Sequence, residues 1–491
     1  MAGSPGVKGK LQDDSGIAQT PSLSTVGVIV AAPSSAFKGI PKYVSGGSEE
    51  LINLYGSAKA GYEGFVAAKL IADTTSCWVY NVPSTETGTL TSASVTLKSS
   101  VATDLVKVTS KAKGTKYNAY SILVTSSGIG TFSMNLLDED GDIVESFQDI
   151  SFDKYSLSYI GNIISEYLTF EDLTDGALTS VVVAGEFPLA GGTDLVITVS
   201  DADYIAGINA LNDLDTYGCG SIVVPCNSHK PAILSALASA LAEDGATEGI
   251  VCPPEHVYEA QDVVAWTNGE YTDGLVSYPE NSINNSQIAV YAPWGKVYDT
   301  DLEDYVWISG EPEVIKSKVF TSDNYQPWFA PAGPIRGKVD RFIDLKTMYD
   351  EGKRDLLYGG TNIVNPIAKL GSAGFLIYGQ KTSLRNITQQ LTRVNVRTLQ
   401  NYIYRTIMPA SLEYVFEPND EFTWGNWILM ASTFMKSLKD ARGVYDYKVI
   451  MAPTDTEIDQ FKMLGIIKYK PTKAAEFSEI TFNLKSKSSE L

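Results

Sequence analysis

The sequence predicts a multidomain protein that combines α/β and α+β architecture. An α/β core domain carries a β-rich inserted domain, followed by a C-terminal α+β domain, with extended N- and C-terminal arms. Three observations lead to this prediction. Strand-like and helix-like stretches alternate over residues 191–375, as in domains with a partly parallel sheet. Residues 85–190 are rich in Ser, Thr and Val and show mainly the alternation of strands. A length of 491 residues fits about three domains.

The predicted boundaries follow these changes in pattern. They are 1–20 for an N-terminal arm, 21–84 and 191–375 for the two parts of the core, 85–190 for the inserted domain, 376–474 for the C-terminal domain and 475–491 for a C-terminal arm or strand. The first twenty residues hold several glycines and few large apolar side chains, so they cannot form a packed element alone.

The core begins with elements of both kinds. Ser48 is a plausible helix N-cap and Gly56 a stop signal for the same helix. The predicted strands here are Val26–Ala32 and Cys77–Val82, and the predicted helices are Ser48–Tyr55 and Tyr62–Ala72. After the insertion the predicted strands are Leu195–Val199, Ser221–Pro225, Gly249–Cys252 and Ile288–Tyr291, and the predicted helices are Asp203–Leu214, Lys230–Ala242 and His256–Trp266.

Within the inserted domain, the stretch SMNLLDEDGDIVESF predicts two strands joined by a tight acidic turn at Asp138–Gly141. The C-terminal third differs again. We expect helices over Asn395–Ile407 and Asp420–Arg442 and strands over Tyr447–Met451 and Ile466–Lys470. The last stretch, Ala475–Leu484, alternates apolar and polar residues as a strand does. It either completes the sheet of its own domain or pairs with another chain.

Composition excludes several classes of protein. The net charge of −20 argues against a dominant role in nucleic-acid binding. Residues 101–315 carry 7 Lys and Arg against 33 Asp and Glu, whereas residues 316–491 carry 24 against 18. An acidic outer surface with a basic partner-facing part gives such a distribution, and so does simple solubility of the middle segment. No apolar run is long enough for a membrane span, and the N-terminus lacks the apolar core of a signal peptide.

Residues typical of catalysis or metal binding do not converge. The four cysteines lie in or beside apolar strand-like runs and are expected to be buried hydrophobes without a zinc site. His229 and His256 are isolated, and neither a phosphate-binding loop nor a nucleophile elbow occurs. The acidic run at Asp138 lacks the later ligands of a calcium loop, so a hairpin turn is favoured. The sequence therefore predicts a protein that is not an enzyme and has no cofactor.

Seven short segments, in order along the chain, resemble the sheath proteins of contractile phage tails. They are Pro5-Gly6-Val7 with Asp14-Ser15-Gly16 and Ser24-Thr25-Val26; Pro188-Leu189-Ala190-Gly191-Gly192-Thr193-Asp194 with Asp203-Tyr204; Ala292-Pro293-Trp294; Pro327-Trp328-Phe329-Ala330-Pro331-Ala332-Gly333 with Arg336-Gly337; Gly379-Gln380-Lys381-Thr382; Asn395-Val396-Arg397; and Phe416-Glu417-Pro418-Asn419. Lys381 replaces an arginine that is usual in the family, and Thr398 stands where a second arginine is common. Residues 85–185 carry no such match.

The resemblance implies a structural subunit that polymerises as stacked hexameric rings around a tail tube and contracts without ATP. Its partners would be further copies of itself, the tail tube protein, and baseplate and terminator proteins, with neither nucleic acid nor membrane insertion. It would be made in the host cytoplasm and become part of the virion. The resemblance also implies strand exchange between subunits by the arms, for which the residues expected are Val7, Gly9, Leu11, Phe477, Ile480, Phe482 and Leu484.

A second expected contact lies on the helix predicted over Asp420–Arg442. Lys436, Lys439 and Arg442 are spaced three apart opposite its apolar face. They are either a solvated face or an electrostatic contact with an acidic tube.

Two other functions stay open at this point. One is the sheath of a phage-tail-like bacteriocin or injection system. The other is a surface carbohydrate-binding protein or carbohydrate-active enzyme, which the β-rich insertion and 27 tyrosines would fit. The clustering of acidic residues in one turn argues against this last function.

Overall fold

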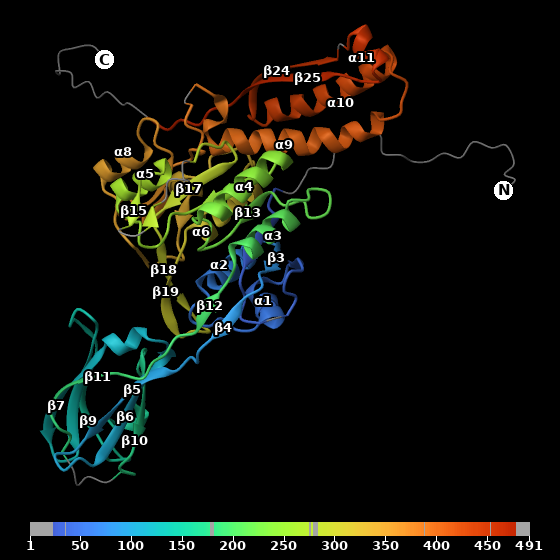
Figure 1. Ribbon diagram of the computed structural model, residues 1–491. Helices are drawn as coiled ribbons and strands as arrows, with labels where there is room; N and C mark the ends of the chain where they lie inside the picture. The colour runs from blue at the N-terminus through green and yellow to red at the C-terminus, as the bar shows by residue number, and fades with distance from the viewer. Residues whose placement is uncertain are drawn as a thin grey trace, which may run out of the picture.

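The computed structural model describes residues 23–34, 36–176, 181–273, 276–277, 283–386, 388–451 and 453–477. The predicted N-terminal arm and the chain beyond Phe477 lie outside these ranges. Along the long axis of the molecule, a β-rich unit lies at one end, a large sheet with helices in the middle, and a layer of two long helices and a hairpin at the other end (Figure 1).

A nine-stranded sheet organises the middle of the molecule. Its strands, in spatial order, are β2 (Lys42–Val44), β3 (Cys77–Asn81), β1 (Val26–Val30), β13 (Ser221–Val223), β14 (Glu248–Val251), β17 (Ile288–Ala292), β22 (Val364–Lys369), β23 (Phe375–Ile377) and β20 (Lys338–Val339). The strands from β3 to β22 are parallel, and the outer strands β2, β23 and β20 pair antiparallel. Five of the strands predicted for the core are confirmed as strands of this sheet. They are Val26–Ala32 (β1), Cys77–Val82 (β3), Ser221–Pro225 (β13), Gly249–Cys252 (β14) and Ile288–Tyr291 (β17).

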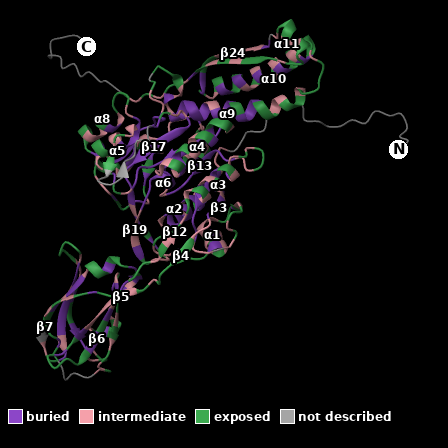
Figure 2. Cartoon of the chain, viewed as in Figure 1, coloured by how far each residue is buried: buried purple, intermediate pink, exposed green. Residues whose placement is uncertain are grey.

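Helices cover both faces of this sheet, as a parallel sheet with two buried faces requires. One face is packed by α1 (Gly47–Tyr55), α2 (Glu63–Ala72) and α6 (Glu311–Asn324), the other by α3 (Asp201–Leu211), α4 (Pro231–Asp244), α5 (Ala260–Asn268) and α8 (Glu351–Tyr358). In β1, Val28 faces one cluster and Ile29 the other, so the strand is buried throughout. Strand β17 of the same sheet is likewise buried along its length (Figure 2). Short elements complete the core: α7 (Gly333–Arg336), β15 (Thr272–Asp273) and β16 (Val276–Ser277).

The start of α1 differs from the prediction. Ser48 is not its N-cap, because the helix begins at Gly47 and the Ser48 amide instead donates to the Asp73 carboxylate at 2.7 Å. The acidic partner thus comes from the end of α2, a contact that the local sequence does not reveal. Gly56 does end the helix, with a φ of 83° that glycine adopts without strain.

The β-rich unit packs two antiparallel sheets around its own apolar cluster. The sheets are β10 (Leu168–Asp172), β6 (Asp104–Lys113) and β5 (Ser92–Lys98), and β11 (Gly185–Pro188), β7 (Ser121–Gly128), β8 (Thr131–Leu137) and β9 (Ile143–Ser151). The predicted hairpin with its turn at Asp138–Gly141 is confirmed as β8 and β9. The Asp138 carboxylate closes this turn by accepting hydrogen bonds from the amides of Asp140 and Asp142.

A thin ribbon joins this unit to the rest of the chain. It pairs β4 (Thr85–Thr87) with β12 (Val196–Thr198). The strand predicted over Leu195–Val199 therefore does not belong to the large sheet, because its partner is the chain that enters the β-rich unit. Its alternation carries no information on which partner it pairs with.

A second connection braces the β-rich unit. The strands β18 (Gly295–Asp299) and β19 (Asp304–Ile308) project from the core, with β21 (Asp344–Leu345) beside them. The buried Asp304 carboxylate accepts hydrogen bonds from the Lys116 ammonium at 2.8 Å and the Tyr117 hydroxyl at 3.2 Å. At the same hairpin, the Lys69 ammonium lies 2.8 Å from the Asp299 carboxylate. This hairpin is thus tied to α2 on one side and to the β-rich unit on the other.

The C-terminal layer contains α9 (Val394–Ser411), α10 (Glu421–Asp440), β24 (Val444–Met451), α11 (Asp455–Asp459) and β25 (Gly465–Pro471). The predicted helices and strands of this region are confirmed, except that α10 ends two residues before Arg442. Asp420 is the N-cap of α10, since its carboxylate accepts hydrogen bonds from the amides of Phe422 and Thr423. Trp328, from the loop after α6, is buried in the apolar cluster of this layer.

Helix α9 is buried on its polar side as well as on its apolar side. Leu399 and Ile403 pack within the C-terminal layer. On the other side, the Arg405 guanidinium donates to the carbonyl of Ala246 at 3.0 Å, to that of Gly218 at 2.9 Å and to that of Cys219. These carbonyls precede β13 and β14, so Arg405 joins the C-terminal layer to the edge of the large sheet.

A carboxylate of the sheet reinforces this attachment. Glu248, at the start of β14, accepts hydrogen bonds from the Thr398 hydroxyl at 2.7 Å and from the Asn401 amide at 3.2 Å. Its second oxygen lies 2.8 Å from the Lys318 ammonium on α6. Thr398, where the family usually has an arginine, therefore takes part in the joint as a hydroxyl donor. None of the helices in the described ranges is both long enough and apolar enough to span a membrane.

Replacement of Arg405 by Leu should detach the C-terminal layer, because several buried carbonyls would lose their donors. We expect a loss of about 3–5 kcal/mol in the stability of that layer. Hydrogen exchange of α9, α10 and the hairpin measures it. The control is Arg442→Leu, whose side chain is exposed. Equal protection of the layer in both variants would contradict the assigned role of Arg405.

Candidate functional site

The hairpin of β24 and β25 is the feature of the C-terminal layer most suited to assembly. Its strands pair from Val444 opposite Pro471 to Met451 opposite Gly465. Within the described ranges the hairpin is a two-stranded sheet, so the outer edge of each strand has no strand beside it. Such an edge presents unpaired backbone donors and acceptors and accepts a further strand.

One face of the hairpin is packed and the other is free. Tyr447, Val449, Ile467 and Tyr469 pack toward α10, and the Tyr447 hydroxyl donates to the Ser432 carbonyl at 3.1 Å. This contact fixes the hairpin on the helix. Both outer edges can therefore accept a strand without any movement of the layer beneath.

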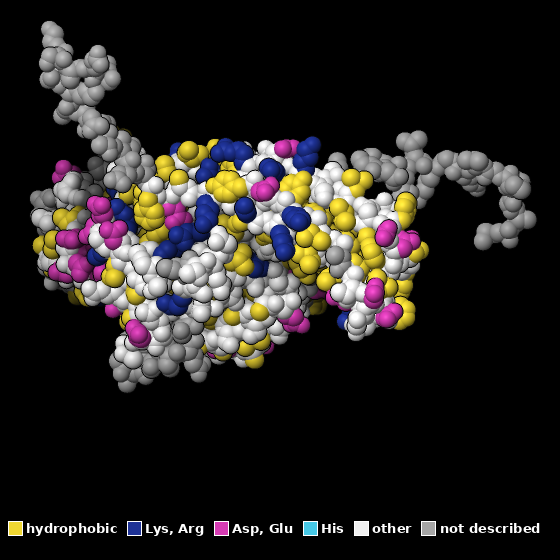
Figure 3. Space-filling model, turned by 90° about the horizontal axis from the view of Figure 1, so that it is seen from above, with side chains coloured by type: hydrophobic (Ala, Val, Ile, Leu, Met, Phe, Trp, Pro, Cys, Tyr) yellow, Lys and Arg dark blue, Asp and Glu magenta, His cyan; other side chains and the backbone are white. Residues whose placement is uncertain are grey.

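Lysines dominate the free face. Lys448 lies directly opposite Lys468, and Lys470 lies opposite Asp446. Two like charges across a strand pair destabilise it unless an anion lies near. Lys and Arg side chains gather on the side of the molecule seen from above (Figure 3). This face favours an acidic partner.

The chain beyond the hairpin is fixed at one point, which we call the root clamp. The Glu476 carboxylate binds the Arg393 guanidinium through two contacts, of 2.6 Å and 3.0 Å. The Gln380 side-chain amide donates to the same carboxylate at 3.0 Å. A bidentate Arg–carboxylate pair fixes orientation as well as position. The root clamp therefore fixes Glu476 against the start of α9.

Lys381 stabilises the chain next to the root clamp. Its ammonium is buried and donates to the backbone carbonyls of Tyr358, Gly360 and Asn362, the last two at 3.1 Å and 3.0 Å. Burial lowers the pKa of Lys381 to about 8, and Arg393 acts in the same direction. The ammonium thus still satisfies the carbonyls at the end of α8 at neutral pH. Lys381, which stands where an arginine is usual in the family that the sequence resembles, therefore satisfies these backbone carbonyls.

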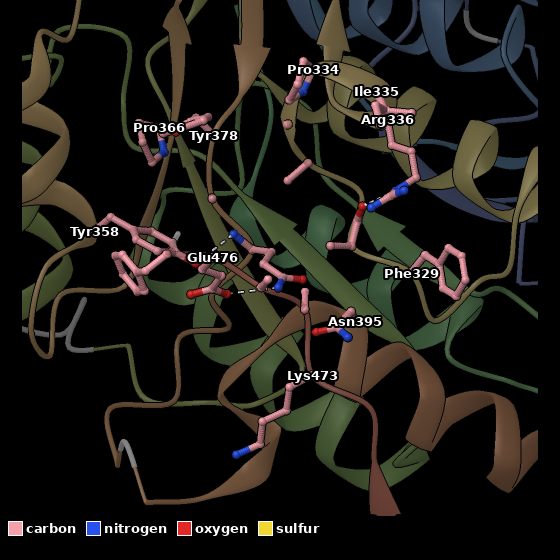
Figure 4. A pocket seen from close by; sticks show the side chains of 18 of the residues that line it. Phe329, Pro334, Ile335, Arg336, Tyr358, Pro366, Tyr378, Asn395, Lys473 and Glu476 are labelled. Carbon is pink, nitrogen blue, oxygen red and sulfur yellow. Dashed lines mark hydrogen bonds between the residues drawn. The ribbon is translucent and has the colours of Figure 1, made fainter. Parts of the chain in front are cut away.

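A groove of about 850 Å³ lies beside the root clamp. Residues 472–477 form one wall, and residues of α8, α7 and the chain that follows β23 form the others (Figure 4). Phe329, Pro334, Ile335 and Tyr378 supply its apolar surface.

The predicted strand-exchange residues lie mostly outside the described ranges. Six of them lie outside these ranges, so their role stays a prediction: Val7, Gly9, Leu11, Ile480, Phe482 and Leu484. Phe477 is described and lies at the mouth of the groove with 86% of its surface exposed. Residues 475–477 are not in a strand, so the predicted strand Ala475–Leu484 does not begin at Ala475. Among the described residues, no strand pairs with them.

The structure separates the three predicted tube-contact residues. Lys436 is exposed on α10. Lys439 is also exposed, but its ammonium lies 3.1 Å from the Asp446 carboxylate. Arg442 lies beyond the helix with a φ of 62°, and its guanidinium is 5.8 Å from the centre of the Phe329 ring. The helical spacing therefore does not extend to Arg442, because the helix ends first.

Sequence reasoning missed the root clamp. Gln380 was part of a matched segment but had no assigned contact, and Arg393 and Glu476 are 83 residues apart. A single sequence does not show that two charged residues so far apart in the chain will form an ion pair. In the described ranges, no group of three or more His, Cys, Asp or Glu side chains is placed to hold a metal ion.

Comparison with known proteins bears on this geometry. No family model matches the chain. The tail sheath protein of Vibrio phage KVP40 is 25% identical over 385 residues, which cover 74% of this chain and 55% of that protein. The chain is thus similar in sequence to phage tail sheath proteins. It spans about half the length of this sheath relative.

Solved sheath structures share the fold. The sheath of the PVC extracellular contractile injection system, in its contracted state, superposes with a TM-score of 0.56 at 14% identity and covers 98% of both chains. The contracted helical sheath of the anti-feeding prophage gives 0.55 at 15% identity, over 98% of this chain and 99% of that one. The mixed α/β architecture of this chain is therefore that of sheath proteins.

Replacement of Glu476 by Gln should free the chain end from the body. The side-chain amide that replaces the carboxylate lacks the charge that holds Arg393, so we expect the backbone amide of Thr472, which donates to the Gly443 carbonyl at 3.0 Å, to exchange about tenfold faster. Hydrogen exchange followed by NMR measures this in the isolated subunit. Asp446→Asn, which breaks the exposed pair with Lys439, is the matched control and should leave the Thr472 amide unchanged. Unaltered exchange in Glu476→Gln would show that the carboxylate does not fix the root.

Proposed function

We propose that the chain is the structural subunit of a contractile tail sheath. It polymerises as a helical stack of hexameric rings around a tail tube, and it contracts to drive the tube through the host envelope. The energy is stored in a metastable extended assembly, and the subunit is not an enzyme. The observation that carries the proposal is a hairpin with two open edges next to a clamped chain end, in a chain related to sheath proteins.

Strand exchange would connect the subunits. Residues 472–477, which the root clamp holds, line the groove together with residues of α7 and α8. The C-terminal arm, through Phe477, Ile480, Phe482 and Leu484, would then pair with the hairpin of a neighbour, and the N-terminal arm, through Val7, Gly9 and Leu11, with a second edge. An interface that joins different surfaces of two copies builds an open helix.

Arms of this kind would maintain connectivity while the bodies move. Main-chain hydrogen bonds hold an added strand whatever the orientation of the domain from which it comes. Contraction would then be a rigid-body rotation and sliding between bodies that remain tied by strands.

The other proposed partners are the tail tube, the baseplate and the tail terminator. The lysine face of the hairpin, with Lys436 and Lys439, would lie against an acidic tube surface. Each exposed ion pair contributes about 0.2–1 kcal/mol, which is weak enough for the tube to be released on contraction. The subunit would be made in the host cytoplasm and become part of the virion.

Electron microscopy of the concentrated full-length protein tests this function. We expect hollow tubes with a regular helical repeat. Subunits that stay monomeric at every salt concentration, even in the presence of baseplates and tubes, would contradict the proposal.

The alternating apolar residues of the C-terminal arm should be essential for the polymer. Replacement of Ile480, Phe482 and Leu484 by Ser removes the side chains that would enter pockets on the neighbour. We expect a folded subunit that forms no tubes in electron micrographs. The matched control replaces Glu479, Thr481 and Asn483 by Ser and should still form tubes. Tubes from both variants would show that this arm does not connect the subunits.

Charge reversal of Lys436 and Lys439 to Glu should weaken binding to purified tail tubes. Two lost attractions and two new repulsions correspond to about a five- to thirtyfold weaker affinity. The loss should shrink at high salt. Co-sedimentation measures the affinity. The control reverses Lys98 and Lys107 in the β-rich unit, where Lys98 also pairs with an aspartate, at 3.1 Å. If the control variant lost as much affinity, the contact would not lie on α10.

The sheath of an injection system or bacteriocin is the second candidate. The two sheath structures described above belong to an extracellular contractile injection system and an anti-feeding prophage. Electron microscopy of the producing cells separates the two. Tails attached to DNA-filled heads indicate a phage, and headless tails indicate an injection device.

A further inference from the structure

Two residues that line the groove beside the root clamp each carry a buried oxygen that accepts no hydrogen bond from any described residue. They are Oε1 of Gln380 and Oδ1 of Asn395, whose side chains are only 3% and 5% exposed. Their amide nitrogens are already used: that of Gln380 donates to Glu476, and that of Asn395 to the carbonyls of Trp328 and Thr472 at 3.4 Å and 3.5 Å. Since these partners only accept, the orientation of both amides is settled. Neither oxygen therefore has a donor among the described residues.

The wall formed by residues 473–477 is also incomplete. Within the described ranges, the backbone of these five residues makes no hydrogen bond. Across the groove lie the apolar side chains of Phe329, Ile335 and Tyr378. An extended segment that brings backbone N–H groups on one side and apolar side chains at every second position would satisfy both walls.

We propose that residues 478–491 fold back into this groove in the unassembled subunit. The described chain ends at Phe477, which itself lines the groove, so these fourteen residues begin at its mouth. Fully extended they reach roughly 45 Å, more than enough to turn and pair with residues 473–477. Ile480, Phe482 and Leu484 alternate as the apolar wall requires.

The tether decides which chain occupies the groove. A segment attached at the mouth has an effective concentration on the order of millimolar. A segment from a second copy is present only at the concentration of the free subunit, which is far lower in dilute solution. The chain's own tail therefore occupies the groove first.

This contact would regulate assembly, and in this respect it rests on the proposed function. The same three apolar residues cannot occupy the subunit's own groove and the hairpin of a neighbour at once. The free subunit thus keeps its exchange strand covered. A growing sheath end would have to offer a better site before the strand is released.

Hydrogen exchange of the full-length monomer tests the contact directly. Sedimentation first establishes the dilution at which the protein is monomeric. Ile335→Asp places a charge in the groove at a side chain that is 62% exposed, and Ile343→Asp is the matched control, 54% exposed and outside the groove. We expect the amides of residues 480–484 to exchange about tenfold faster in Ile335→Asp than in the wild type or the control. Equally fast exchange in all three proteins would overturn the proposal.

A labelled peptide of residues 478–491 identifies the occupant. It should bind the full-length variant with Ser at 480, 482 and 484, whose groove is vacant, about tenfold more tightly than the wild type, and Ile335→Asp should abolish this binding. If a peptide of residues 1–22 binds the vacant groove instead, the occupant is the N-terminal segment of a second copy and the proposal is wrong. Tube formation is measured separately by electron microscopy. A tail that is protected in the monomer, in a protein that forms no tubes, contradicts only the proposed function. A tail that is unprotected in the monomer, in a protein that does form tubes, contradicts only this inference.

Discussion

The burial of both sides of α9 is the constraint on which the position of the C-terminal hairpin depends. Most surface helices bury one apolar stripe and leave the other side in water. Here the apolar side holds α10 and the hairpin, while Arg405, Thr398 and Asn401 hydrogen-bond to the edge of the large sheet. A polar joint of this kind specifies one orientation, because each donor needs its own acceptor. The hairpin is therefore presented at a fixed angle to the core.

The same helix fixes the start of the chain end. Arg393 is the residue immediately before α9, and its guanidinium holds Glu476. The position of the hairpin and the exit of the C-terminal residues are thus set by one rigid element. A polymer built through strand exchange needs this coupling, because the reach and direction of each strand must match the position of the edge that receives it.

At the opposite end of the molecule, the β-rich unit is held by two connections. The ribbon of β4 and β12 carries the chain, and Asp304 on the projecting hairpin binds Lys116 and Tyr117. A ribbon alone would allow this unit to swing. The buried carboxylate at the second contact makes the unit an extension of the core.

The sequence predicted most elements of the fold because each carries a local signal. The strand Val26–Ala32 is a continuous apolar run, and Asp420 caps its helix through its own side chain. Errors arose where the partner is distant. The strand Leu195–Val199 pairs with the chain entering the β-rich unit, and the amide of Ser48 is satisfied by Asp73.

The candidate site was less accessible from the sequence. The alternation of Ala475–Leu484 predicted a strand but not where it leaves the body, because that depends on the pairing of Arg393 with Glu476. The lysine spacing on α10 could not show that the helix ends before Arg442. Free edges, vacant acceptors and clamps are properties of the folded chain, and one sequence does not display them.

A cryo-electron microscopy reconstruction of the assembled polymer tests the central claim most directly. The measurement is the number and origin of the strands in the C-terminal sheet. Assembly through the chain ends predicts additional strands at the edges of β24 and β25, at least one of them formed by residues 478–484 of another subunit. A polymer in which this hairpin stays two-stranded, with the chain ends elsewhere, would contradict the account.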